Sequence, residues 1–197
     1  MKTLSEWATL TSGSPQFRIR ETCAASAPLY TYYSQSDFES DRAGLTAAAD
    51  AERRQVRTND AVSTLATGDV VFSLLTGQAA RVGVSHAGFL YTQNYVRLAP
   101  VRQLDAGFLV YLLNEDRAIR HQLHLGLQGS QVLKYTLRQL KELEPGPLPP
   151  LARQKAIGDV YARQLCLKAL RERTARLELT IQLEKLREAA NHERSTI

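Results

Sequence analysis

The chain has 197 residues, of which 44% are hydrophobic and 23% are charged, and its formal net charge is +5. This composition excludes a disordered chain and allows one globular domain with an appendage. No apolar run reaches the roughly 20 residues needed to cross a bilayer, and the N-terminus lacks the apolar core of a signal peptide. The sequence therefore predicts a cytoplasmic protein with no membrane partner.

The basic excess lies mostly in the last quarter of the chain. Of the 25 Lys/Arg and 20 Asp/Glu residues, 10 and 6 fall within residues 151–197. A modest basic excess fits a nucleic-acid partner, but without a polybasic arm the contacts have to come from individual side chains on a folded surface. Cys23 and Cys166 are far apart in sequence and too few for a disulfide framework.

The first 60 residues contain one alternating segment and one polar segment. In Phe17–Arg20, apolar residues alternate with Arg18 and Arg20, as on a strand with one buried face, and this spacing places both guanidinium groups on one side. Residues 40–60 are polar and rich in alanine, which predicts a surface loop with one helical turn at most.

The middle of the chain predicts mixed α and β structure. Residues 69–75 are β-branched and apolar and indicate a buried strand, and residues 87–91 and 95–98 predict two more strands. Apolar residues at helical spacing over 104–125 predict a helix. Residues 136–143 predict a shorter helix whose first residue, a threonine, is its N-terminal cap.

A proline-rich segment separates this region from a long helix. Four prolines and a glycine lie within residues 144–150, which excludes helix interior and central strand and predicts a stiff connector. Good helix formers follow to about residue 191, interrupted only by Gly158. We therefore divide the chain into a head (1–144), a connector (145–150) and a long helix (151–197).

The long helix carries two apolar stripes on different sides. A helix of about 40 residues is about 60 Å long, too long to fold back on a small domain along its whole length. The stripes therefore need other helices as partners, although a helix broken near Gly158 and packed on its own domain is the alternative. The first stripe, a heptad seam, consists of Val160, Leu167, Leu170, Leu177 and Ile181. The second stripe consists of Leu165, Ala169, Leu179, Leu183 and Leu186.

Several segments, in order, resemble one half of a Type I restriction–modification specificity subunit. The most specific is Gly146–Ile157, where a Pro-Leu-Pro-Pro-Leu run enters the long helix ahead of Gln154 and Ile157. The other resembling segments are Leu4–Gly13, Leu65–Ser73, Gln93–Leu98 and Gly129–Leu140.

This resemblance implies an α+β fold, with one target-recognition domain followed by one long helix. Members of the family carry two of each, so the resemblance implies that a second recognition domain comes from another molecule. We expect a homodimer through an antiparallel coiled coil of residues 151–191, with double-stranded DNA and a DNA methyltransferase subunit as partners. The chain departs from the family in its length and in Glu144-Pro145-Gly146, where members more often run directly from a strand into the prolines.

Polar side chains on predicted loops are the candidates for DNA contact. Bases are read and phosphates are held mainly by Arg, Lys, Asn, Gln, Ser and Thr. Each of these residues could instead be part of a solvated strand face or a plain turn. The candidates are Ser14, Gln16, Arg18, Arg20, Tyr32, Tyr33, Gln35, Gln78, Arg81, Ser85, His86, Gln93, Asn94, Gln128, Ser130 and Lys134.

Catalytic motifs are absent from the sequence, so we expect a chain that is not an enzyme and that needs no cofactor or metal. There is no phosphate-binding loop, no dinucleotide fingerprint and no nucleophile elbow. His121 and His124 lie one helical turn apart, but no third metal ligand of a suitable kind is near them in sequence.

Three functions fit these features. The leading hypothesis is a sequence-reading subunit that recruits a DNA methyltransferase, with or without a nuclease–translocase. The second is an orphan DNA-binding regulator or antirestriction protein derived from such a subunit. The third is a helical-arm adaptor whose head binds protein, which the low net charge of residues 1–150 leaves open.

Overall fold

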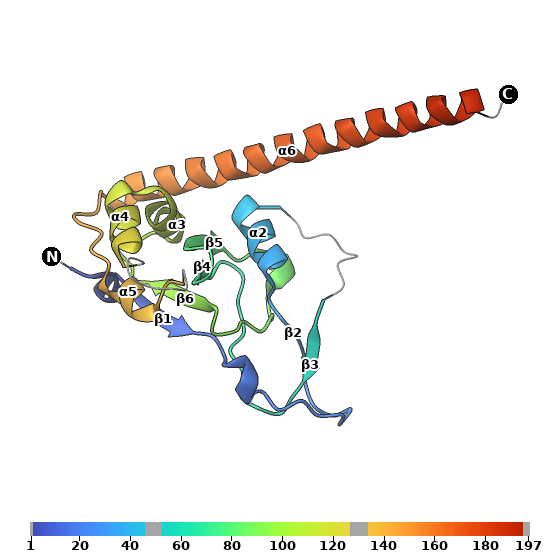
Figure 1. The fold of residues 1–197 in the computed structure, drawn as a ribbon. Coiled ribbons are helices and arrows are strands. Elements are labelled where there is room, and N and C mark those ends of the chain that lie inside the picture. The colour runs from blue at the N-terminus through green and yellow to red at the C-terminus, as the bar shows by residue number, and fades with distance from the viewer. Residues whose placement is uncertain (1, 46–52, 127–133, 195–197) are drawn as a thin grey trace.

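The computed structural model describes residues 2–45, 53–126 and 134–194, with side chains to residue 191. The long helix α6 (Leu151–Arg194) lies along one side of a mixed head and projects beyond it (Figure 1). The α+β fold with a long C-terminal helix is therefore confirmed, and the helix begins directly after the proline segment.

A four-stranded antiparallel sheet forms the centre of the head. Its strand order is β1-β6-β4-β5, with bounds Ala8–Ser12, Tyr95–Pro100, Val70–Ser73 and Gln78–Arg81. The strands predicted over 69–75 and 95–98 are present as β4 and β6. The strand predicted over 87–91 is wrong, because only Leu90 in that segment forms bridges, to Tyr32 and Thr64.

Helices α1 (Leu4–Trp7), α3 (Ala106–Glu115), α4 (Arg117–Leu125) and α5 (Leu137–Glu142) pack against this sheet around the largest apolar core. The single helix predicted over 104–125 is two helices. The Asp116 carboxylate accepts hydrogen bonds from the N–H groups of Ala118 and Ile119, and this cap begins a new helix, α4. The expected cap of α5 is confirmed.

The segment predicted over residues 40–60 as a surface loop with one helical turn at most contains that turn, residues 40–43 at the end of a longer helix, but it also contains a strand that was not predicted. Helix α2 (Gln35–Ala43) begins at a capping box made by Ser34 and ends at Gly44, whose left-handed φ of 63° suits glycine. Strand β3 (Gln55–Arg57) pairs with β2 (Leu29–Thr31) in a small ribbon. Buried Val56 anchors this ribbon to a core of its own.

The start of α6 is fixed to the head by Gln154, the glutamine of the connector motif. Its side chain is 2% exposed, and its Oε1 accepts a hydrogen bond from the Asp105 N–H at 2.9 Å. Its Nε2 donates to two backbone carbonyls, at 2.9 and 3.0 Å. Ile157 packs against the main core. These contacts explain why a glutamine and an apolar residue follow the prolines at this spacing.

Gly158 is the point of closest approach between α6 and α3. A Cβ on Gly158 would lie 2.6 Å from the carbonyl carbon of Gly107 and 2.6 Å from the Phe108 nitrogen. The alternative of a helix broken at this glycine is wrong, because α6 is continuous through it. The glycine permits close helix packing instead.

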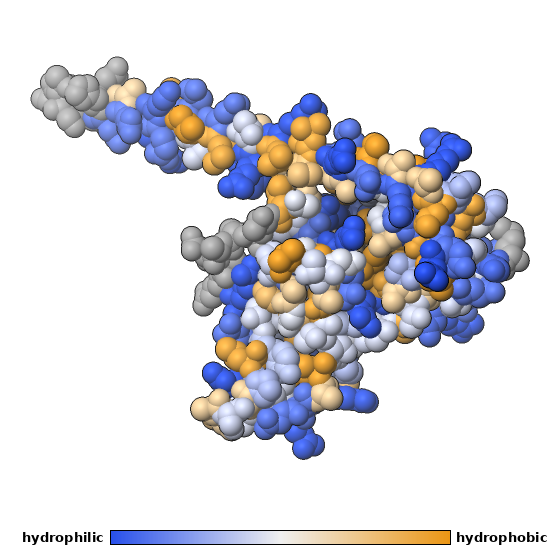
Figure 2. Space-filling model, turned by 180° about the vertical axis from the view of Figure 1, so that it is seen from behind, coloured by the Kyte–Doolittle hydropathy of each residue, from blue (hydrophilic) through white to orange (hydrophobic). Residues whose placement is uncertain are grey.

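Beyond the head, every described residue of α6 from 171 to 191 is exposed. Leu177 and Ile181 of the heptad seam are 53% and 54% exposed, and apolar residues stand out along the projecting helix in Figure 2. The second stripe is divided, because Leu165 and Ala169 are half-buried beside α2, whereas its outer leucines are exposed.

Candidate nucleic-acid interface

Four of the predicted DNA-binding residues are buried, so the prediction that their side chains contact DNA directly does not agree with the structure. Ser14 is 9% exposed, and its Oγ accepts a hydrogen bond from the Ser63 N–H at 2.8 Å. Tyr32 is 8% exposed and belongs to the small core beneath the ribbon. Tyr33 and His86 are buried in a polar cluster. Sequence patterns identified polar residue types but not the direction of their side chains.

The polar cluster connects α2 to the 3-10 turn Val84–His86. His86 Nδ1 lies 2.8 Å from Asp41 Oδ1, and His86 Nε2 lies 3.2 Å from Asp37 Oδ1. The Tyr33 hydroxyl donates to Asp41 Oδ2 at 2.8 Å, and the guanidinium Nε of Arg53 lies 3.2 Å from Asp37 Oδ1. Buried carboxylates are stable only when paired, so these contacts fix the relative positions of three segments.

Two pKa shifts follow from this packing. Burial by itself would raise the pKa of Asp37, but hydrogen bonds from Ser34 and the charges of His86 and Arg53 outweigh it, and the pKa is lowered. Burial, together with Asp41, raises the pKa of Tyr33. Asp37 is thus an anion and Tyr33 a neutral donor, which matches the hydrogen bonds that they make.

Residues 16–20 lie in the dark-blue segment at the lower end of the head in Figure 1. Within this segment Gln16, Arg18 and Arg20 are exposed. The alternating strand predicted here is wrong. Residues Gln16–Arg18 form a 3-10 turn, and Phe17 is 77% exposed where a buried face was expected. Ile19 alone turns inward, toward the small core.

Sequence reasoning missed three arginines at the ribbon strand β3. Arg53 and Arg54 precede the strand and Arg57 ends it, and Arg54 is exposed. The Arg54 guanidinium carbon lies 5.0 Å from the centre of the Tyr32 ring. The available signal was the Arg-Arg-Gln-Val-Arg run, in which a single valine between polar residues marks a short strand with one buried position.

A second group of predicted residues lies around the turn that precedes β6, where Lys134, from the segment before α5, reaches Asn94. The Lys134 ammonium donates to Asn94 Oδ1 at 3.0 Å, and Gln93 beside it is exposed. Gln78 is half-buried at the start of β5, opposite Ser73. The predicted residues Gln128 and Ser130 lie outside the described residues.

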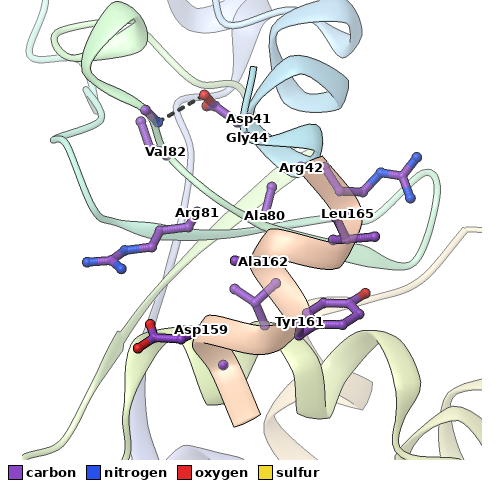
Figure 3. Close-up of a pocket in the computed structure, with 14 residues that line it drawn as sticks. Asp41, Arg42, Gly44, Ala80, Arg81, Val82, Asp159, Tyr161, Ala162 and Leu165 are labelled. Atoms are coloured by element: carbon purple, nitrogen blue, oxygen red, sulfur yellow. Dashed lines mark hydrogen bonds between the residues drawn. The ribbon is translucent and has the colours of Figure 1, made fainter. Parts of the chain in front are cut away.

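The remaining predicted residues lie nearer to α6. Arg81 ends β5 and Ser85 follows it, and both are exposed, whereas Gln35 is half-buried at the start of α2. Arg81 stands at the edge of a cleft of about 280 Å³ between the head and α6, and its side chain extends to the same side as that of Asp159 (Figure 3). The predicted residues are therefore spread over several elements of the head, and the Tyr95 hydroxyl on β6, which donates to Gln35 Oε1 at 3.4 Å, connects two of these elements.

Other kinds of site find no support in the described part of the chain. Within residues 2–45, 53–126 and 134–194, no three His, Cys, Asp or Glu side chains are placed to hold a metal ion. His121 and His124 are both exposed. None of the described helices is both long and apolar enough to cross a membrane.

Two solved structures match nearly all of the chain. The HsdS subunit from Thermoanaerobacter tengcongensis matches with a TM-score of 0.53 and 19% identity, over 88% of this chain and 38% of that chain. A structure solved for the complex assembly and conformational transition of the type I R-M system matches with a TM-score of 0.56 and 20% identity, over 94% and 42%. No protein-family model and no curated protein matches the chain.

The fold is that of a Type I specificity subunit. The chain spans about two fifths of the length of the two solved chains, and the matched part contains both head and long helix. At this level of identity the likeness concerns the specificity-subunit fold, so the roles of individual side chains rest on their own geometry.

Proposed function

We propose that this chain is a non-catalytic specificity subunit that reads DNA sequence and recruits a DNA methyltransferase subunit in the cytoplasm. The observation that carries the proposal is the fold, because the head and the helix together match two solved structures of this kind over 88% and 94% of the chain. In this proposal the sequence-reading domain is the head, residues 1–144, and the connector 145–150 joins it to the helix.

The DNA-contacting residues in this proposal are the predicted ones that reach solvent. Exposed and half-buried side chains can reach base edges or phosphates, whereas Ser14, Tyr32, Tyr33 and His86 support the surface from below. The proposed contacts are Gln16, Arg18, Arg20, Gln35, Gln78, Arg81, Ser85, Gln93, Asn94 and Lys134, together with Arg54.

The proposed assembly is a homodimer through antiparallel α6 helices. The apolar residues Leu170, Leu177 and Ile181 are 46–54% exposed, and exposed apolar stripes along a projecting helix are stabilised by a second helix. A two-fold pairing of such arms gives two identical heads, one at each end of a rigid spacer.

Co-expression with the methyltransferase subunit from the same cell tests this function. Methylome sequencing of a host that carries both genes should reveal one new methylated motif, absent when either gene is omitted. The chain alone should show no methyltransferase, nuclease or ATPase activity that survives repeated purification. Specific DNA binding without any new methylation would favour the orphan-regulator hypothesis, and intrinsic activity would overturn the proposal.

A further inference from the structure

The most exposed aromatic ring of the described residues projects from the lower end of the head. Phe17 is 77% exposed, at the centre of the 3-10 turn Gln16–Arg18, the dark-blue turn at the bottom of Figure 1. The turn is closed by hydrogen bonds from the Arg18 N–H to the Pro15 carbonyl at 2.9 Å and from the Ile19 N–H to the Gln16 carbonyl at 3.3 Å. Backbone contacts, and not packing of the ring, therefore hold Phe17 outward.

One cation lies against this ring. The guanidinium carbon of Arg18 lies 5.6 Å from the centre of the Phe17 ring, and Arg20, two residues further along the chain, is exposed. In the described part of the chain, neither Arg18 nor Arg20 forms a salt bridge.

Two acidic residues, Asp60 and Glu21, lie near this turn. The Asp60 carboxylate accepts a hydrogen bond from the Arg20 backbone N–H at 2.7 Å, and Glu21 is an exposed carboxylate. The lower end of the head thus presents an apolar ring with Arg18 against it and Arg20 two residues away, and neither arginine is held in an ion pair within the described residues.

We propose that Phe17 is a wedge that inserts between neighbouring base pairs of the DNA half-site, while Arg18 and Arg20 hold the flanking phosphates. This inference rests on the proposed function and adds a deformation of DNA to it. Apolar wedges beside cations are a known means of unstacking a base step and kinking the duplex. An apolar groove on a protein partner would match the ring but not the exposed cations of Arg18 and Arg20, so charge complementarity favours DNA.

The wedge makes part of the recognition indirect. A step that unstacks easily, such as a pyrimidine–purine step, costs less free energy to open than a stiff one. The protein would therefore prefer flexible steps at the position of Phe17, without hydrogen bonds to those bases. This preference should come from the ring and not from the arginines.

A fluorescence experiment tests the wedge. Duplexes that bind the purified full chain are selected from a random library, and 2-aminopurine is then placed at each position of the selected half-site in turn. Binding of the wild-type chain should increase fluorescence at one step per half-site. Phe17→Ala should abolish the increase and weaken binding by about tenfold to a hundredfold, whereas Phe17→Leu should retain part of both effects. The matched control is Leu125→Ala, an exposed apolar residue on α4, which should change neither.

Each other outcome has a defined meaning. A selected duplex that shows no unstacking, or unstacking that survives Phe17→Ala, overturns the wedge and leaves sequence reading intact. Loss of methyltransferase binding in Phe17→Ala without loss of DNA binding identifies the turn as a protein contact and also overturns the wedge. Failure to select any duplex overturns the proposed function and the wedge together.

Discussion

At the scale of single residues, the buried polar cluster decides how the reading surface is held. Asp37 and Asp41 lie on α2, and His86 lies on the turn after β5, so the contacts of the His86 ring with both carboxylates join elements that are remote in sequence. Two of the residues that sequence reasoning assigned to DNA contact, Tyr33 and His86, belong to this cluster. Their polarity satisfies buried carboxylates instead of facing solvent.

The lowered pKa of Asp37 gives a pH dependence with a definite sign. A carboxyl whose pKa is lower in the folded state than its ordinary value of 3.8 stabilises the fold when the pH is above 3.8. This stabilisation is lost as the pH falls from 3.8 through the folded-state pKa. Asp37→Asn should therefore lower the free energy of unfolding at pH 7 by about 1–3 kcal/mol, and the difference from wild type should shrink in acid. Urea unfolding at pH 7 and pH 3 measures this difference.

A carboxylate on the same helix provides the control. Glu39 pairs with Arg42 at the surface, where its side chain is 40% exposed, so Glu39→Gln should change stability little at either pH. An equal destabilisation by Asp37→Asn at pH 7 and pH 3 would contradict the assignment of Asp37 as a stabilising anion.

At the scale of elements, the crossing of α6 and α3 fixes the direction in which the long helix leaves the head. Gly158→Ala places a methyl group 2.6 Å from the backbone of α3. Although alanine is the better helix former by about 1 kcal/mol, the backbone clash should dominate and destabilise the protein by about 1–3 kcal/mol. Thermal unfolding measures the net effect, with Ala152→Leu in the exposed first turn of α6 as the control. A rise in Tm for Gly158→Ala would show that the helices separate at no cost.

The projecting part of α6 is predicted to pair with the same helix of a second copy of the chain. We expect light scattering to report about twice 22.0 kDa for the wild-type chain. Changing Leu170, Leu177 and Ile181 together to Glu should give monomers with a folded head, because three buried charges per helix oppose pairing. The matched control introduces three glutamates on another side of the same helix, at Ala175, Gln182 and Ala189, and should remain dimeric. A dimer that survives the first triple change would show that the seam lies elsewhere on α6.

At the scale of the whole molecule, two identical heads on one rigid spacer predict a two-fold symmetric, bipartite DNA target. The half-site separation should then follow the length of the arm. Deleting Leu179–Lys185, two helical turns, shortens the arm by about 10 Å, or about three base pairs. Methylome sequencing should show a shorter unread spacer with unchanged half-sites. A target with two unrelated halves would mean that the second head belongs to a different protein.

The sequence by itself determined the features that depend on local physics. The proline segment ended one unit and started the next, since proline lacks an N–H and fixes φ, and the helix after it followed from residue propensity over more than 40 positions. The strands β4 and β6 and the cap of α5 were equally local. The fold class could be predicted because these signals are long or strongly punctuated, and the family resemblance placed them in order.

Only the tertiary structure decided which side chains reach solvent. Burial of Val56 fixed a polar segment as a ribbon strand, and this burial depends on contacts with Tyr32 and Leu90, which are far away in the chain. The cap of Asp116 and the 3-10 turn at Phe17 are local hydrogen bonds, but the spacing of apolar residues does not specify them. The candidate surface was therefore predicted by residue type. Packing fixed the buried supporting cluster, and backbone hydrogen bonds of the 3-10 turn fixed the exposed ring beside Arg18.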